Sequence, residues 1–177
     1  VRGLLYMRVM IFSGSHPRHH FIHKALLNSE LDCAAVVMER EDLLPKPPSN
    51  ISHQDRNNFI KHFHERDIVE SKFFGKTKSE EVFNDVPTLF CQSEDLNSIE
   101  TANFVKRFSP DWVFIFGVDI IKDPLLKVLP QNRVNLHLGL SPWYRGSATL
   151  FWPFYFLQPQ FSGVTFHQIV PEADAGE

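Results

Sequence analysis

The sequence predicts an α/β fold, in which a mostly parallel, twisted sheet carries helices on both faces. Two observations support this class. Short, continuous apolar runs, typical of strands that are buried on both faces, alternate with polar segments at helical spacing. Several of these runs end at a glycine or a Ser-Gly pair, as buried strands often do where they enter a turn. In such a βαβα arrangement, ligands bind at the carboxyl ends of the strands.

Six apolar runs are the expected strands, and they lie at 8–12, 33–38, 87–91, 112–116, 134–138 and 163–170. The expected helices lie at 21–27, 54–74, 98–108, 124–129 and 148–157. We expect Gly75 to cap the second helix and Asn97 or Ser98 to cap the third. Pro153 is expected to break the last helix. No internal repeat or low-complexity segment is visible. We therefore expect a single Rossmann-like domain over 1–177.

The composition is that of an ordinary globular domain. With 177 residues and 43% apolar content, the chain can bury a sizeable core. The formal charge of -3 gives no general basic field, which weighs against a nucleic-acid partner and leaves a local basic patch open. No apolar run has the length of a membrane span, and we expect residues 1–6 to be a leader remnant. Cys33 and Cys91 lie in strand-like runs, as reduced core cysteines of a cytoplasmic protein do.

The most informative polar residues are Asn135 and His137, which lie two positions apart on an expected strand. Their side chains therefore point to the same face. An amide that donates hydrogen bonds and an imidazole that moves protons suit acyl transfer, and Asp174 from a later loop could orient the imidazole. His167 is expected to be structural or substrate-lining. Alternatively, Asn135 and His137 are a locally satisfied strand edge, and Asp174 belongs to an ordinary turn.

Three motifs follow in order and resemble the folate-dependent formyltransferase family. The first is Asn135-Leu-His137, the second is Ser141-Pro-Trp-Tyr-Arg-Gly146, and the third is Asp174-Ala-Gly after the Gly163-Val-Thr-Phe-His run. The second motif has Ser where the family usually has Leu. The resemblance extends from Met7 to the end, and its specific part is 134–177. The family includes enzymes that act on methionyl-tRNA, glycinamide ribonucleotide and amino sugars.

The resemblance implies 10-formyltetrahydrofolate as the cosubstrate and Asn135, His137 and Asp174 as catalytic residues. Asn135 would donate to the oxyanion that develops on the formyl group, and His137 would relay the proton between the two nitrogens. No metal is expected. The resemblance also implies a folate-binding set, which consists of Phe116, Gly117, Val118, Ile120, Ser141, Pro142, Gly146 and Val170. A plain strand-to-helix turn at 116–121 remains an equal alternative.

The segment after the first strand, 13–20, contains three histidines and an arginine. It shows no complete set of metal ligands, and an anion site at a helix N-terminus suits it better, although a solvated loop stays open. The glycinamide ribonucleotide enzymes have a glycine-rich phosphate loop here, so the bulky residues weigh against that substrate. We assign the acceptor side to Arg18, His19, Tyr144 and Arg145.

Three hypotheses of function follow. The first is formyl transfer to a primary amine of an amino-sugar nucleotide or similar small acceptor, the second is the methionyl-tRNA formyltransferase activity, and the third is a non-catalytic folate-binding or regulatory domain. By the resemblance, 39–86 is a helical insertion, and the catalytic domain would continue past Glu177. No sequence pattern indicates an oligomer.

Overall fold

The computed structural model describes residues 7–40, 46–146, 149–171 and 176. The expected leader at 1–6 and the predicted catalytic Asp174 lie outside the described residues.

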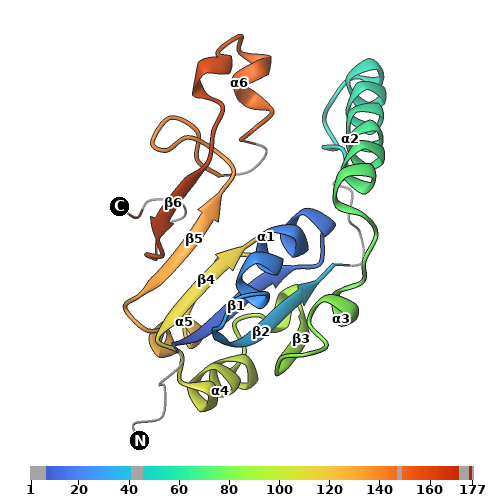
Figure 1. The fold of residues 1–177 in the computed structure, drawn as a ribbon. Coiled ribbons are helices and arrows are strands. Elements are labelled where there is room, and N and C mark those ends of the chain that lie inside the picture. The colour runs from blue at the N-terminus through green and yellow to red at the C-terminus, as the bar shows by residue number, and fades with distance from the viewer. Residues whose placement is uncertain (1–6, 41–45, 147–148, 172–175, 177) are drawn as a thin grey trace, which may run out of the picture.

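One six-stranded sheet forms the centre of the molecule, in the order β3-β2-β1-β4-β5-β6 (Figure 1). The strands are β1 (Arg8–Gly14), β2 (Asp32–Glu39), β3 (Thr88–Gln92), β4 (Trp112–Phe116), β5 (Arg133–His137) and β6 (Thr165–Gln168). The first five strands pair in parallel, and β6 runs antiparallel to β5 at the edge. The order reverses between β1 and β4, which places the switch point of the sheet there.

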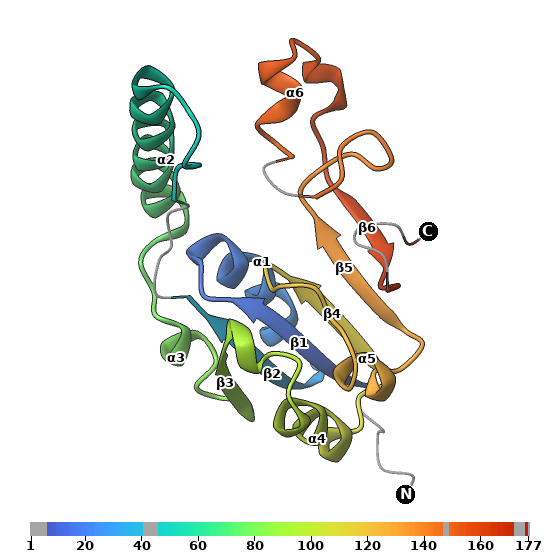
Figure 2. The same ribbon diagram turned by 180° about the vertical axis from the view of Figure 1, so that it is seen from behind.

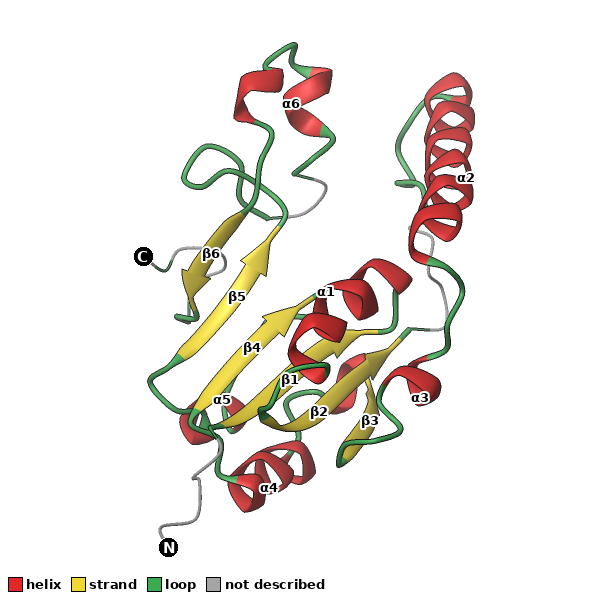
Figure 3. Cartoon of the chain, in the orientation of Figure 1, coloured by secondary structure: helices red, strands yellow, loops and turns green. Residues whose placement is uncertain are grey.

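Helices lie along both faces of the sheet, as predicted (Figure 3). The α-helices are α1 (Pro17–Leu27), α2 (His53–Phe74), α3 (Ser79–Val82), α4 (Ile99–Phe108), α5 (Leu125–Val128) and α6 (Trp152–Tyr155). Two short 3-10 turns occur at Ser93–Asp95 and Pro159–Phe161. Within the described ranges, no helix is both long and apolar enough to cross a bilayer.

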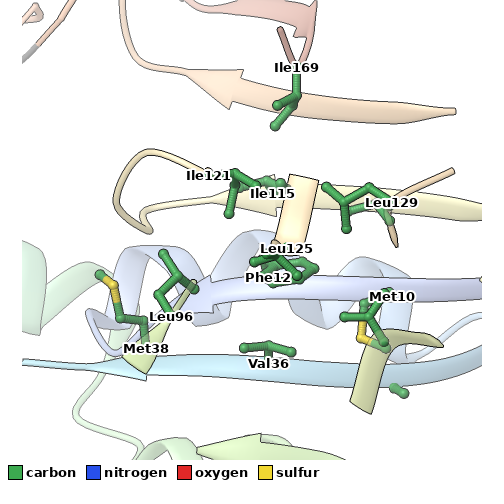
Figure 4. Packing of buried hydrophobic residues seen from close by; sticks show 13 residues of the cluster. Met10, Phe12, Val36, Met38, Leu96, Ile115, Ile121, Leu125, Leu129 and Ile169 are labelled. Atoms are coloured by element: carbon green, nitrogen blue, oxygen red, sulfur yellow. The ribbon is translucent and has the colours of Figure 1, made fainter. Parts of the chain in front are cut away.

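Two cores form because the side chains of each strand alternate between the faces. On β1, Met10 and Phe12 join the core under α4 and α5 (Figure 4). Val9 and Ile11 of the same strand join the opposite core, which packs against α1 and α3. Figure 2, which views the molecule from behind, shows the face of the sheet that α4 and α5 cover. A continuous apolar strand is thus explained by burial on both faces.

Local signals fix both ends of α2 and the start of α4. The Ser98 hydroxyl accepts from the Thr101 amide at 3.2 Å and caps α4, as one of the two predicted caps. The Ser52 hydroxyl caps α2 in the same way, with its oxygen 3.0 Å from the Asp55 amide nitrogen. Gly75 ends α2 with φ of 80°, a conformation that favours glycine. Although α2 has 22 residues, none of them is buried.

Two segments differ from the prediction. Instead of the helix expected at 148–157, the structure has the shorter α6. Pro153 lies in its first turn, where a backbone N–H makes no helical hydrogen bond, so the proline does not break the helix. The first helix begins at Pro17, four residues before its expected start. Both differences concern the position of a proline in the first turn. The short helix α3 was not predicted.

Candidate active site

Asn135 and His137 lie on the same face of β5, at its carboxyl end. In the parallel register, Asn135 is level with Ile115 of β4. In the antiparallel register with β6, Asn135 faces His167 and His137 faces Thr165. The sheet thus brings the predicted amide and imidazole together, and it adds two polar side chains from β6.

His167 is the direct partner of Asn135. Its Nε2 lies 3.1 Å from the amide nitrogen of Asn135, and its Nδ1 lies 2.9 Å from the carbonyl oxygen of Gln168. A carbonyl only accepts, so Nδ1 carries the proton and Nε2 accepts from the Asn135 amide. This contact fixes the direction of the Asn135 amide. A structural or substrate-lining role for His167 stays a prediction.

His137 is buried, with 6% of its surface exposed, and its imidazole is held by the loop that follows β5. Its Nε2 lies 2.9 Å from the carbonyl oxygen of Tyr144. Because that oxygen can only accept, Nε2 carries a proton and donates to it. The rings of His137 and His167 lie 6.3 Å apart at 72°.

Gly139 allows this contact to form. A Cβ at this position would lie 2.5 Å from His137 Nε2, 2.5 Å from the Tyr144 carbonyl oxygen and 2.7 Å from the Thr149 Cβ. The Thr149 hydroxyl donates to the carbonyl of Leu138, and Thr149 is buried. The backbone must therefore pass directly beneath the imidazole, which only glycine permits. Sequence reasoning missed this residue because its neighbours come from separate parts of the loop.

The predicted loop at 141–146 folds back over the end of β5. The Thr165 hydroxyl accepts from the Ser141 amide at 3.0 Å and donates to the Gly139 carbonyl at 2.8 Å. The Tyr144 hydroxyl donates to Gln158 at 2.8 Å. Trp143 stacks on Phe161 with ring centroids 5.3 Å apart. Pro142, Arg145 and Gly146 are exposed at the rim.

The loop after β4, predicted to bind folate, is held by side chains from neighbouring segments. Asn97 donates to the Ile120 carbonyl at 3.0 Å and accepts from the Lys122 amide at 2.7 Å. Asp119 accepts from Arg40 and from Ser93, which follow β2 and β3. The carboxyl ends of four neighbouring strands are thereby connected, since the Ser15 hydroxyl after β1 accepts from the Arg40 amide at 3.3 Å.

Within that loop the predicted residues differ in exposure. Phe116 is buried and Val118 packs against the α4–α5 core, whereas Ile120 has 51% of its surface exposed. Gly117 has φ of 84°, which favours glycine. The loop therefore exposes the apolar side chain of Ile120, and hydrogen bonds hold its backbone in place.

His19 fills the switch point between β1 and β4. A Cβ on Gly14 would lie 2.5 Å from its Nδ1, and a Cβ on Gly117 would lie 2.2 Å from its Cε1. The ring also packs edge-on against Phe116 at 4.6 Å. Only 8% of the residue is exposed, and burial holds its pKa well below the usual value, with Arg18 adding to the effect. The predicted acceptor residue His19 is thus enclosed by protein atoms.

The other histidines of α1 are buried along the same helix face. Burial lowers the pKa of His23 to about 3, and burial and Arg18 lower that of His16 to about 4. His23 packs edge-on against Phe114 at 5.7 Å. These rings are neutral at pH 7. Among the described residues, no group of three or more metal-binding side chains is arranged to hold an ion.

Arg18, the other predicted acceptor residue on α1, is paired with α2. Its guanidinium lies 2.7 Å from the carboxylate of Glu70. The same carboxylate lies 3.3 Å from His16 Nδ1 and 3.6 Å from Arg66 Nε. Sequence reasoning did not connect the 39–86 segment with this loop.

Near the end of the chain, Val170 is half-buried, and the backbone at Gly176 passes against β6. A Cβ on Gly176 would lie 1.8 Å from the carbonyl oxygen of Gln168. Gly176, two residues after the predicted Asp174, thus lies against the edge strand β6.

No family model matches the sequence. Solved structures do share its fold. Phosphoribosylglycinamide formyltransferase from Anaplasma phagocytophilum matches with a TM-score of 0.62 and 15% identity, over 97% of this chain and 68% of that one. The enzyme of the same name from Streptococcus pneumoniae matches with a TM-score of 0.59 and 15% identity, over 97% of this chain and 78% of that one.

A formyltetrahydrofolate deformylase from Pseudomonas syringae also matches, with a TM-score of 0.57 and 17% identity. The match covers 98% of this chain and 49% of the deformylase, so the chain spans about half of that protein's length. The chain therefore has the fold seen in these formyltransferase and deformylase structures, as the sequence predicted.

Proposed function

We propose that this chain transfers a formyl group from 10-formyltetrahydrofolate to a primary amine of a small acceptor, such as an amino-sugar nucleotide or a similar amine. The observation that carries the proposal is the pair of Asn135 and His137, which share one face of β5 and are each held by a defined partner. The fold shared with formyltransferases supports it, as does the order of the three sequence motifs.

The reaction begins when the uncharged acceptor amine attacks the formyl carbon and a tetrahedral oxyanion forms. One amide hydrogen of Asn135 is committed to His167, so the other is the one that donates to the oxyanion. His167 acts here as a positioning residue, because it sets the plane of the amide. Removing one such donor typically costs on the order of 100-fold in rate.

His137 relays the proton from the attacking amine to the folate nitrogen. Its Nδ1 accepts the proton from the attacking amine while the Nε2–H remains on the Tyr144 carbonyl, which stabilises the imidazolium. The imidazolium then gives the proton to the folate nitrogen as the formyl carbon–nitrogen bond breaks. Asp174, which lies outside the described residues, is assigned to orienting the imidazole and ordering water for this relay.

We assign the folate donor to the loop after β4. A pterin ring needs a flat apolar contact and fixed backbone groups, and Ile120 and the loop held by Asn97 provide both. We assign the rest of its site to Phe116, Gly117, Val118, Ser141, Pro142, Gly146 and Val170. The acceptor side is assigned to Tyr144 and Arg145 at the rim and to Arg18 and His19 at α1.

Turnover of 10-formyltetrahydrofolate with a panel of primary amines tests the proposal, with released tetrahydrofolate as the readout. The His137→Ala variant should lose transfer while folate binding, followed by calorimetry, stays within about threefold. The matched control is His64→Ala, at an exposed position of α2. Transfer at the normal rate in His137→Ala would reject the assigned role.

Formate release without any amine would instead indicate hydrolysis, the activity named for the deformylase of the same fold. Filter binding with tRNA at two salt concentrations tests the methionyl-tRNA alternative, since phosphate contacts weaken steeply with salt. Folate binding without turnover of any kind would support the non-catalytic alternative.

A further inference from the structure

The segment around α6 carries a group of exposed apolar side chains that follow one another in the sequence. It lies beyond the carboxyl end of β5, at the end of the molecule where α6 projects from the sheet (Figure 3). Every residue from 150 to 157 except Pro153 is exposed, with between 38% and 87% of its surface open to solvent. We call these residues the α6 patch; they are five aromatic residues, at 151, 152 and 154–156, together with Leu150 and Leu157.

The aromatic rings of the α6 patch are packed on one another although they are exposed. Trp152 stacks on Phe156 with ring centroids 5.9 Å apart, and it meets Phe151 edge-on at 5.2 Å. The segment is also tied to the loop after β5, because the Tyr144 hydroxyl donates to Gln158 at 2.8 Å. A surface that is already ordered in this way loses little conformational entropy when it binds a partner.

Leu157 stands at a position that would favour glycine or asparagine. Its φ is 56°, and 87% of its surface is exposed. Positive φ is unfavourable for a leucine, and a side chain so exposed gains almost nothing from burial within its own chain. A contact made outside the chain explains why an apolar side chain is kept there.

The α6 patch lies in a part of the sequence that has no charged residue. From 146 to 171 there is no Asp, Glu, Lys or Arg. The exposed apolar residues of α2 differ, because Ile68 and Val69 are flanked by carboxylates. In a twofold-symmetric dimer the same surface of both copies meets, so a charged patch would repel its own copy, whereas this patch does not. The lack of Lys and Arg also removes the attraction that nucleic acids and anionic lipids require.

The size of this surface fits a second copy of the chain. Trp143 extends the α6 patch, since it stacks on Phe161 in the 3-10 turn that packs against α6. With about 180 Å² for each large apolar residue, the exposed fractions of Trp143 and the patch amount to about 800 Å². This exceeds the roughly 300–600 Å² of the largest apolar patch on a typical monomer. It equals the approximately 800 Å² that each partner contributes to a specific interface.

We propose that the α6 patch is the interface of a symmetric homodimer, in which α6 of one copy packs against α6 of the second. The centres of protein interfaces are rich in Tyr, Trp and Phe and poor in charge, as this patch is. The inference goes beyond the proposed function and does not depend on it.

Sedimentation velocity at micromolar to submillimolar concentrations of the chain tests the proposal, and we expect a dimer that forms with rising concentration. Phe154→Asp places like charges on the two meeting surfaces and should raise the dimer Kd by about tenfold or more. Phe73→Asp is the matched control, because it makes the same change at an exposed aromatic residue of α2. A mixture of Phe154→Asp and Phe154→Lys should associate again, which a variant that merely misfolds would not do.

Leu157→Asn keeps the test decisive if the charged variants fail to fold. Asparagine tolerates positive φ and removes the apolar side chain, so this variant should weaken the dimer while its Tm stays equal or rises. A monomer at every concentration, or equal association of Phe154→Asp and Phe73→Asp, would overturn the proposal. Binding of a monomer to phosphatidylcholine vesicles, lost in Phe154→Asp, would also overturn it and assign the patch to a lipid surface.

Discussion

Gly139→Ala tests whether the backbone beneath His137 holds the imidazole in place. The added methyl would lie 2.5 Å from both His137 Nε2 and the Tyr144 carbonyl oxygen, so each must withdraw by about 0.9 Å to reach the 3.4 Å of an ordinary contact. The 2.9 Å hydrogen bond between those two atoms cannot survive that separation. Overpacking costs about 1–3 kcal/mol and the lost hydrogen bond about 1 kcal/mol.

We therefore expect Gly139→Ala to lower the free energy of unfolding by about 2–4 kcal/mol, measured by urea denaturation. The imidazole nitrogen resonances of His137 should also lose the signature of an Nε2-protonated ring. Gly163→Ala is the matched control, because a Cβ there would make only ordinary contacts, at 3.5 and 3.7 Å, with Leu140. Equal stability of the two variants, with unchanged His137 resonances, would refute this account of the site.

Two other predictions follow from the same structure. The unfolded chain binds protons on His16 and His23 near pH 6.5, whereas the folded chain does so only near 4 and 3. Stability should therefore be complete above pH 6.5 and fall as the pH drops toward 4, with each of the two histidines contributing a loss of about 1.4 kcal/mol per pH unit. Urea unfolding at pH 7, 6 and 5 measures this, and His23→Leu should flatten the slope; an unaltered slope would contradict it. Asn97→Ala removes both bonds to the loop after β4 and should weaken folate binding about tenfold, whereas Asn103→Ala on the exposed side of α4 should not. Equal affinities in the two variants would argue against the loop as the folate site.

The sheet was predictable because its signals are local. Each of the central strands is a continuous apolar run, so burial on both faces is visible in the sequence itself. The shared face of Asn135 and His137 followed from a spacing of two on a strand. The antiparallel direction of β6 was not predicted, because nothing in residues 163–170 encodes which neighbour the strand pairs with or in which direction.

The contacts that hold the candidate site depend on pairing across the fold. His167 meets Asn135 only through the antiparallel register, and Gly139 is constrained by a carbonyl five residues later in a folded loop. Glu70 meets Arg18 across 52 positions of sequence. Residue types can therefore indicate the chemistry of a site from sequence, whereas the partners that orient those residues need the tertiary structure.

The long helix α2 contributes to neither of the two packed layers beside the sheet. Its amide hydrogens should exchange with solvent long before those of β1 or β2, because opening α2 exposes little apolar surface. Mutations along most of its length will leave the folding of the domain almost untouched. Evolution can therefore reshape this helix without rebuilding the scaffold below.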